Sequence, residues 1–287
     1  MYLTGFADEA ATDIDGQIKA IKELGWSNIE SRNIGGVNIH DLPDAEFDVV
    51  AGKLADAGIS INCFGSAIAN WAKNIQAPFD EDLAAAKRAI PRMQRLGTRL
   101  IRVMSYPPIK DRPMDDQMAE ERFARLRTLT KLFLDAGIQI VHENCMNYGG
   151  QGWRYTLKML DAVPGLKLVF DTGNPVNTED RERPGKRQSA WEFYSHVKEH
   201  VVYVHIKDGV VDEEGHTKWC FCGEGDGDVE RIVRDLVASG YDGGFSMEPH
   251  MAVVAHDASV SSPEQIRFAN FVEYGRRFEK LLARARA

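Results

Sequence analysis

Acidic and imidazole side chains stand at the ends of four consecutive β-like runs in the second half of the chain. They are Glu143 in the run 138–144, Asp171 in 166–172, His205 in 201–208 and Glu248 in 243–249. Three carboxylates gathered in one place repel one another, and this repulsion raises their pKa values unless a cation stabilises the ionised forms. Carboxylate oxygens and a neutral imidazole nitrogen are ligands for a divalent metal. We therefore expect these four residues to hold one divalent metal ion.

The chemical types of these four ligands indicate which metal ion they would prefer. Three oxygen donors and one nitrogen, with no thiolate, suit Mn²⁺ or Mg²⁺ better than a structural zinc site. We expect Mn²⁺, with Mg²⁺, Zn²⁺ and Co²⁺ as alternatives. Cys220 and Cys222 stand close together in the sequence, but no second ligand pair follows them. They are therefore interpreted as two loop cysteines.

Other polar and aromatic residues lie near the same strand ends and are predicted to contact a substrate. They are Glu30, Trp71, Asn144, Asn174, Lys207 and His250. Lys207 follows His205 by two residues, so strand alternation places both on one face. His250 stands in the same relation to Glu248. Each residue also has a purely structural alternative, such as organising a turn or packing a lid.

These residues require a scaffold that brings strand ends together. Eight short runs rich in Val, Ile, Phe and Tyr alternate with longer segments of helical period, as expected for parallel strands buried on both faces. The runs are 2–8, 26–32, 59–65, 99–105, 138–144, 166–172, 201–208 and 243–249, and clear helical segments are 13–25, 45–58, 80–97, 120–137 and 264–287. Glycines between a helix and the next strand are typical of left-handed helix ends. They are Gly25, Gly58, Gly97, Gly137, Gly165 and Gly240.

This alternation predicts a (β/α)₈ TIM barrel that forms a single domain over residues 1–287. A length of 287 residues is close to the roughly 250 typical of such a barrel. A doubly wound open sheet would carry a Gly-rich phosphate turn after its first strand, whereas the sequence there is GFADEA. In a TIM barrel, the carboxyl ends of the strands form the active site.

Composition narrows the classes of partner. A formal net charge of −8 argues against nucleic-acid binding, which needs a basic face. The first residues do not resemble a signal peptide, no apolar stretch is long enough to span a membrane, and four cysteines are too few for a disulfide framework. We expect a cytoplasmic protein that acts on a small-molecule carbohydrate, with no membrane or nucleic-acid partner, and that is able to form a homo-oligomer.

The motifs HEN (142–144), FDTGN (170–174), YVHIKD (203–208) and SMEPH (246–250) together resemble the xylose-isomerase-like TIM-barrel superfamily, also called the sugar phosphate isomerase/epimerase family. This resemblance covers essentially the whole chain. The tagatose 3-epimerase-like members of the family take metal ligands from strands five to eight, which implies Glu143, Asp171, His205 and Glu248 here. It also implies that Glu143 and Glu248 form the catalytic acid–base pair.

The resemblance and the residues together predict a metal-dependent sugar or keto-sugar isomerase or epimerase. It would abstract a proton next to a carbonyl and pass through a metal-stabilised enediolate. Two positions depart from the ketose epimerases, which commonly carry His where this chain has Asn174 and Glu where it has Gly149. A metal-dependent lyase or dehydratase acting on a keto-inositol or 3-keto-glycoside is the first alternative.

Two more distant functions are compatible with the fold. An endonuclease IV-like DNA repair enzyme shares the fold, but it would need more metal ligands and a positive groove. A non-catalytic sugar-binding barrel would bind no metal. The basic segments 154–158 and 180–188 are solvated loops or recruit an anionic substrate, and Asp228 caps the helix that follows GEGDG.

Overall fold

The computed structural model describes residues 1–254 and 257–287. Eight parallel strands form the barrel, in the order β1-β12-β9-β8-β7-β6-β5-β2. Their bounds are β1 Tyr2–Gly5, β2 Asn28–Ser31, β5 Ser60–Gly65, β6 Leu100–Val103, β7 Gln139–Glu143, β8 Lys167–Asp171, β9 Val201–Ile206 and β12 Gly244–Met247. A parallel bridge between Phe6 and Glu30 joins the ends of β1 and β2 and completes the ring. Each strand lies inside its predicted run, so the TIM barrel prediction is confirmed.

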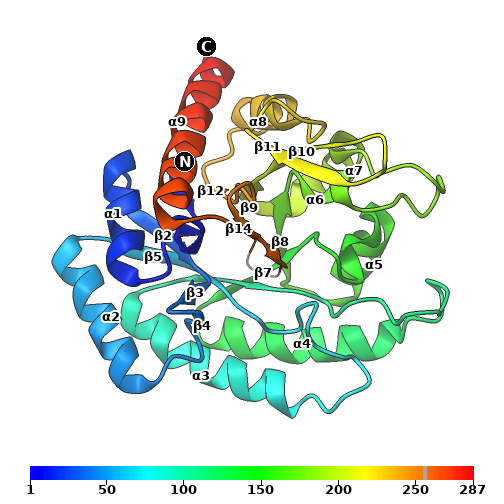
Figure 1. Ribbon diagram of the computed structural model, residues 1–287. Helices are drawn as coiled ribbons and strands as arrows, with labels where there is room; N and C mark the ends of the chain where they lie inside the picture. The colour runs from blue at the N-terminus through cyan, green and yellow to red at the C-terminus, as the bar shows by residue number, and fades with distance from the viewer. Residues whose placement is uncertain (255–256) are drawn as a thin grey trace.

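Helices surround the strands (Figure 1). The main ones are α1 Ile14–Leu24, α2 Asp44–Ala57, α3 Asp80–Leu96, α4 Ala119–Asp135, α5 Trp153–Ala162, α7 Ala190–Val197, α8 Val229–Ala238 and α9 Glu264–Arg286. The last helix, α9, lies beside α1 and so brings the two ends of the chain together (Figure 1). Within the described residues, no helix is both long and apolar enough to cross a membrane.

Local sequence explains where the helices end. All six glycines predicted to terminate helices have positive φ angles, between 67° and 89°. In α1, the apolar residues Ile14, Ile18 and Ile21 recur at helical spacing and are buried against the barrel. On the strands, residues of both faces are buried, and β12 has no exposed residue. This double burial explains the continuous apolar runs.

Short elements cover the end of the barrel that carries the candidate residues. They are the hairpins β3 Asn33–Ile34 with β4 Val37–Asn38, β10 Asp208–Val211 with β11 Thr217–Cys220, and β13 Val253–Val254 with β14 Asp257–Ser261, the one-turn helix α6 Asn174–Asn177, and the 3₁₀ turns Ala7–Glu9 and Gly149–Gln151. A third 3₁₀ turn, Lys198–His200, leads into β9 at the opposite end. The second hairpin was not predicted, and it places Cys220 on a strand rather than in a loop.

The GEGDG segment has a different role from the one predicted. Asp228 adopts a left-handed conformation, φ 50°, and its side chain makes no capping hydrogen bond to α8, so that prediction was wrong. The segment instead wraps around Asp208, whose carboxylate accepts hydrogen bonds from the backbone N–H groups of Gly209, Gly223, Gly225 and Gly227. A side chain at position 225 or 227 would collide with this carboxylate, which explains the alternating glycines.

Candidate metal centre and substrate cavity

Four buried side chains meet at the carboxyl ends of β7, β8, β9 and β12. They are Glu143, Asp171, His205 and Glu248, and one ligand atom from each lies within 4.8 Å of the others. His205 Nδ1 is 3.7 Å from Glu143 Oε1, 3.9 Å from Asp171 Oδ2 and 3.4 Å from Glu248 Oε2. Neighbouring ligand atoms around one Mg²⁺ ion at about 2.1 Å lie about 3 Å apart, and opposite ones about 4.2 Å. The observed separations fall between these values.

The imidazole of His205 is oriented by a carboxylate beneath it. His205 Nε2 lies 3.2 Å from Glu30 Oε1. Glu30 is held in turn by Tyr203 Oη and Ser246 Oγ, which donate hydrogen bonds of 2.9 and 2.6 Å to its Oε2. This arrangement places a proton on Nε2 and leaves Nδ1 facing the three carboxylates. Nδ1 has no hydrogen-bond partner among the described residues, as expected of an atom that ligates a metal.

The backbone at the end of β8 fixes the carboxylate of Asp171. Its Oδ1 accepts hydrogen bonds from the backbone N–H groups of Gly173 (2.9 Å) and Asn174 (2.6 Å), so Oδ2 is directed at the cluster. Asn144 clamps the same strand end, because its side chain donates to Asp171 O at 3.0 Å and accepts from Asp171 N at 2.7 Å. Asn144 therefore positions a candidate ligand.

Three cationic side chains surround the acidic cluster. Arg102 Nη1 on β6 donates a 2.9 Å hydrogen bond to Glu143 Oε2. Arg32 Nη1, just after β2, lies 3.2 Å from Glu248 Oε1. Lys207 Nζ lies 3.1 Å from Asp171 Oδ2 and 3.3 Å from Glu248 Oε2. Because all of these groups are buried, the attraction between opposite charges is only weakly screened.

These neighbours change the protonation of the carboxylates. Burial acts to raise the pKa of Glu143, but the charge of Arg102 and the contact with His205 outweigh it and lower that pKa to about 2. Burial also acts against the charged form of Glu248, yet Lys207 and His250 hold its pKa well below the usual range. For Asp171, burial dominates over the attraction of Lys207, and repulsion from Glu248 and Glu143 adds to it, so its pKa rises to about 7. A divalent cation would relieve this repulsion.

A second carboxylate–histidine pair lies next to Glu248. His250 Nδ1 is 2.9 Å from Glu9 Oε1, and the backbone N–H of His250 donates to Glu9 Oε2 at 2.8 Å. His250 Nε2 is consequently turned toward Glu248 Oε1, at 3.6 Å. His250 itself has a positive φ of 55°, an unfavourable conformation for a residue with a side chain, and its double contact with Glu9 stabilises it.

A cavity of about 230 Å³ opens above the cluster. Of the residues predicted from the sequence, its walls include Trp71, Glu143, Asn174, Lys207, Glu248 and His250. Asn174 also donates a 3.0 Å hydrogen bond to Glu143 Oε1. Glu30 and Asn144 are not part of these walls. Both are buried, and their side chains are hydrogen-bonded to residues of β8, β9 and β12, so the geometry supports positioning roles for them in place of the predicted substrate contacts.

Several residues of the cavity wall were missed by the sequence analysis, Arg102 and Trp219 among them. Arg102 lies within the apolar run 99–105, and the signal that could have revealed it is a single arginine facing inward from a buried strand. Trp219 lies on β11, in a stretch interpreted as a loop, and its ring contacts the edge of His250 with centroids 5.7 Å apart. Lys207 Nζ lies 5.3 Å from the same ring, within reach of a cation–π contact.

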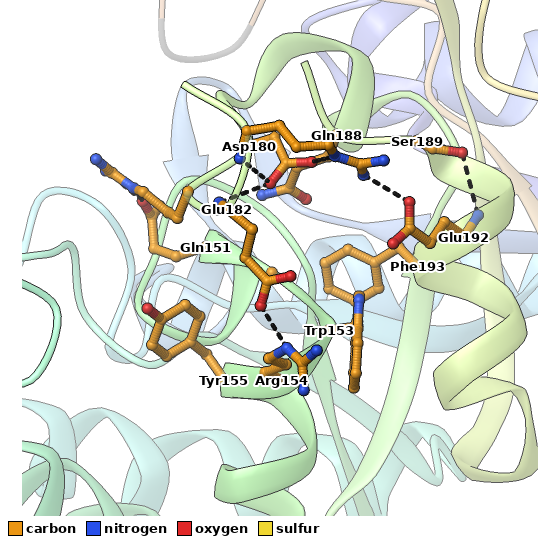
Figure 2. A pocket seen from close by; sticks show the side chains of 13 residues that line it. Gln151, Trp153, Arg154, Tyr155, Asp180, Glu182, Gln188, Ser189, Glu192 and Phe193 are labelled. Carbon is orange, nitrogen blue, oxygen red and sulfur yellow. Dashed lines mark hydrogen bonds and ion pairs between the residues drawn. The ribbon is translucent and has the colours of Figure 1, made fainter. Parts of the chain in front are cut away.

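A second hollow lies away from the acidic cluster, between the 3₁₀ turn 149–151, α5, α7 and the segment 180–189 (Figure 2). Its volume is about 30 Å³, enough for little more than a water molecule. Two arginines of the basic segments form ion pairs there: Arg154 with Glu182 (Figure 2), and Arg183 with both Asp180 and Glu192. These internal pairs favour the interpretation as solvated loops over recruitment of an anionic substrate.

Comparison with known proteins gives the family. Residues 18–269 match the family described as "Xylose isomerase-like TIM barrel". The chain belongs to this family. No match is found among curated proteins.

Several solved structures of the xylose isomerase-like fold match this chain along nearly its whole length. A family member from Mycobacterium smegmatis, in complex with magnesium, is 18% identical with a TM-score of 0.72, covering 100% of this chain and 97% of that one. D-psicose 3-epimerase from Clostridium cellulolyticum H10, with D-tagatose, is 17% identical with a TM-score of 0.70, covering 98% and 99%. A probable 3-DHS dehydratase from Bacillus anthracis is 16% identical with a TM-score of 0.69, covering 94% and 97%. At these identities the likeness concerns the fold.

The residues present fit a divalent metal ion. The four candidate ligand atoms have suitable separations, His205 presents an unpartnered Nδ1 atom, and its other nitrogen is fixed by Glu30. The donor set of three carboxylates and one imidazole is one that hard or borderline divalent cations accept. The cavity above the cluster leaves room for a substrate to reach the same point.

Proposed function

We propose that this protein is a divalent-metal-dependent isomerase or epimerase of sugars or keto-sugars, with Mn²⁺ as its metal. The observation that carries the proposal is the meeting of four buried ligand atoms, within 4.8 Å of one another, at the floor of a cavity lined by polar side chains. A bound divalent cation would supply electrophilic stabilisation of negative charge developing on a substrate carbonyl oxygen.

The chain's own residues account for the remaining tasks. Glu143 and Glu248 lie on opposite sides of the cluster, at the ends of β7 and β12, and are our candidates for removing and returning the proton next to the carbonyl. Lys207 Nζ contributes positive charge beside Asp171 and Glu248, where an oxyanion would form. Asn174 fixes one oxygen of Glu143, and Arg102 fixes the other, so this carboxylate has a defined direction.

A lyase or dehydratase is the second candidate. At position 149, where ketose epimerases commonly carry a glutamate, an added Cβ would lie 2.5 Å from the His142 ring, so a glutamate there would require this ring to move. Lys207 and His250 both line the cavity and could protonate a departing hydroxyl or alkoxyl group. The dehydratase of similar fold is consistent with this outcome. A 3-keto-glycoside or keto-inositol would be the substrate.

The first experiment measures the metal content of the purified protein beside its His205→Ala and Glu248→Gln variants. We expect about one equivalent of divalent metal in the wild type and a large loss in His205→Ala, because an imidazole ligand is removed. His196→Ala is the matched control, since His196 stacks on Trp153 outside the cluster. A folded wild-type protein that neither contains nor binds metal would refute the proposal.

Solvent deuterium separates the two chemistries. Incubation of ketoses, keto-inositols and keto-glycosides in D₂O with the metal-loaded protein would give deuterium next to the carbonyl in an epimerase or isomerase product. An elimination would instead release water or an alcohol and give an unsaturated ketone, visible by its ultraviolet absorption. Glu143→Gln should abolish either outcome if this carboxylate moves the proton.

A further inference from the structure

Neutral amide side chains form much of the cavity wall. They come from three segments, which are the β3–β4 hairpin, the loop that follows β5, and α6 at the end of β8. The asparagines are Asn33, Asn38, Asn70, Asn174 and Asn177. An amide carries both a hydrogen-bond donor and an acceptor without a formal charge, as a hydroxyl group does. The chemistry of this wall therefore suits a ligand that carries several hydroxyl groups.

Two of these amides are buried, and the protein uses only one end of each. Asn70 and Asn174 are each 9% exposed. Asn70 Oδ1 accepts a 3.0 Å hydrogen bond from the backbone N–H of Ala72, while its Nδ2 has no partner in the part of the chain that the structure describes. Asn174 Nδ2 donates a 3.0 Å hydrogen bond to Glu143 Oε1, and its Oδ1 has no partner among the same residues. Leaving such atoms unpaired is costly, and a ligand that pairs with them removes the cost.

The protein partners determine which end of each amide is left for a ligand. A backbone N–H needs the oxygen of Asn70 as its acceptor, and a carboxylate needs the nitrogen of Asn174 as its donor. The loop after β5 therefore presents a donor to the cavity, and the end of β8 presents an acceptor. Hydroxyl groups can satisfy both, because each can accept or donate a hydrogen bond. A phosphate offers mainly acceptor oxygens and cannot satisfy the acceptor of Asn174.

Every arginine and lysine of the described cavity wall already lies beside a carboxylate of the protein. These cations are Arg32, Arg102 and Lys207, and their nearest carboxylate oxygens are 2.9 Å away for both arginines and 3.1 Å away for the lysine. All three side chains are buried. An anionic substituent could bind them only by displacing an internal carboxylate, which would then be buried without its partner. An uncharged substrate avoids this cost.

We propose that the cavity selects an uncharged, polyhydroxylated substrate over its phosphate ester, and that Asn70 and Asn174 bind two of its hydroxyl groups, Asn70 as a donor and Asn174 as an acceptor. This inference rests on the proposed function for the position of the reacting carbonyl above the acidic cluster. Because Asn174 also holds Glu143, the hydroxyl that it binds lies near the reacting carbon.

The test compares matched sugars on the metal-loaded protein. Dissociation constants for D-fructose, D-tagatose and D-psicose, and for the 6-phosphate of each, are measured by ligand-observed NMR titration. We expect the uncharged member of at least one pair to bind about tenfold more tightly than its phosphate ester, because the ester must disrupt an internal ion pair.

Asn70→Ser should weaken the binding of the preferred uncharged sugar about tenfold, because one hydroxyl loses its donor. Serine can keep the local turn, since its oxygen also accepts from the backbone N–H two residues later. Asn74→Ser is the matched control. Asn74 Oδ1 accepts from Gln76 N at 2.9 Å in the same kind of turn, but Asn74 is not part of the cavity wall. Asn174→Ala should also weaken binding, and its metal content is measured as well because Asn174 contacts Glu143.

Three outcomes would overturn this inference. They are a phosphate ester that binds at least as tightly as its parent sugar in every pair, an unchanged affinity for the uncharged sugar in Asn70→Ser, and no binding of any of the six compounds. Metal content and deuterium incorporation in the same samples separate the inference from the proposed function. Deuterium incorporation into a sugar phosphate alone would refute the inference and support the metal-dependent reaction. Asn70-dependent binding of an uncharged sugar by a protein that binds no metal would support the inference and refute that reaction.

Discussion

His205 Nε2 and Glu30 Oε1 lie 3.2 Å apart, and this contact between β9 and β2 crosses the interior of the barrel. It determines which imidazole nitrogen faces the acidic cluster. Burial acts to lower the pKa of His205, but Glu30, Glu143 and Glu248 raise that pKa well above its usual value. A residue that the sequence suggested as a substrate contact is instead the anchor of a candidate metal ligand.

Replacing Glu30 with Gln should weaken metal binding. Loss of the carboxylate lowers the basicity of His205 and loosens its orientation, and changes of this kind typically reduce metal affinity by about 10–100-fold. Competition with a fluorescent chelator measures the effect. Asp82→Asn is the matched control, because Asp82 is also buried but binds Tyr106 Oη and Ala69 N away from the cluster. Unchanged affinity in Glu30→Gln would contradict this role.

Replacing Arg102 with Met should destabilise the protein freed of metal. Glu143 would then be a buried carboxylate without its 2.9 Å partner, and breaking such a pair costs about 3–5 kcal/mol. Urea unfolding in the presence of a chelator gives the free energy. The exposed pair Arg95–Asp48 offers a comparison, since Arg95→Met should cost only about 0–1 kcal/mol. Similar losses in the two variants would show that burial does not strengthen the Arg102 contact.

Two Gly→Ala substitutions should have opposite effects on stability. At position 225, an added Cβ would lie 2.3 Å from Asp208 Oδ1 and 2.5 Å from Gly209 O, so the turn around Asp208 must distort and the protein is destabilised. At position 52, within α2, an added Cβ meets nothing within 4 Å. Gly52→Ala should therefore stabilise the protein by about 0.5–1 kcal/mol through helix propensity. Thermal unfolding monitors both, and a stable Gly225→Ala variant would argue against the tight turn.

The free energy of unfolding should fall as the pH decreases from about 7 to 5, in part because of His40. Burial is the largest influence and lowers the pKa of His40, although Asp41 opposes it. The unfolded chain therefore takes up this proton at a higher pH than the folded protein does, and the contribution of His40 to stability is full above the unfolded pKa and decreases below it. His40→Gln should flatten the unfolding free energy between about pH 7 and 5. Parallel profiles for the two proteins would refute the assignment.

The barrel could be predicted from the sequence because parallel strands that are buried on both faces have continuous apolar sequences. It also located Glu143, Asp171, His205 and Glu248, since ionisable residues at the ends of such runs are conspicuous. The contacts that surround these four residues could not be predicted from the sequence. Whether Glu30 faces the cavity or lies below His205 depends on the stagger between β2 and β9, which are far apart in the chain. The hairpin carrying Trp219 depends on a carboxylate at Asp208 that collects backbone N–H groups from fifteen or more residues later.

The two halves of the chain supply different charged residues to the acidic cluster. Every candidate metal ligand comes from β7 to β12, whereas Arg32 and Arg102, which neutralise two of them, and Glu30, which orients His205, come from β2 to β6. A fragment ending before β7 would keep Asp8 and Glu9 as partners of Arg32 but would leave Arg102 without Glu143, and the remaining fragment would leave Glu143 without Arg102. The charge balance around Glu143 and the orientation of His205 are therefore complete only when the two halves of the barrel pack together.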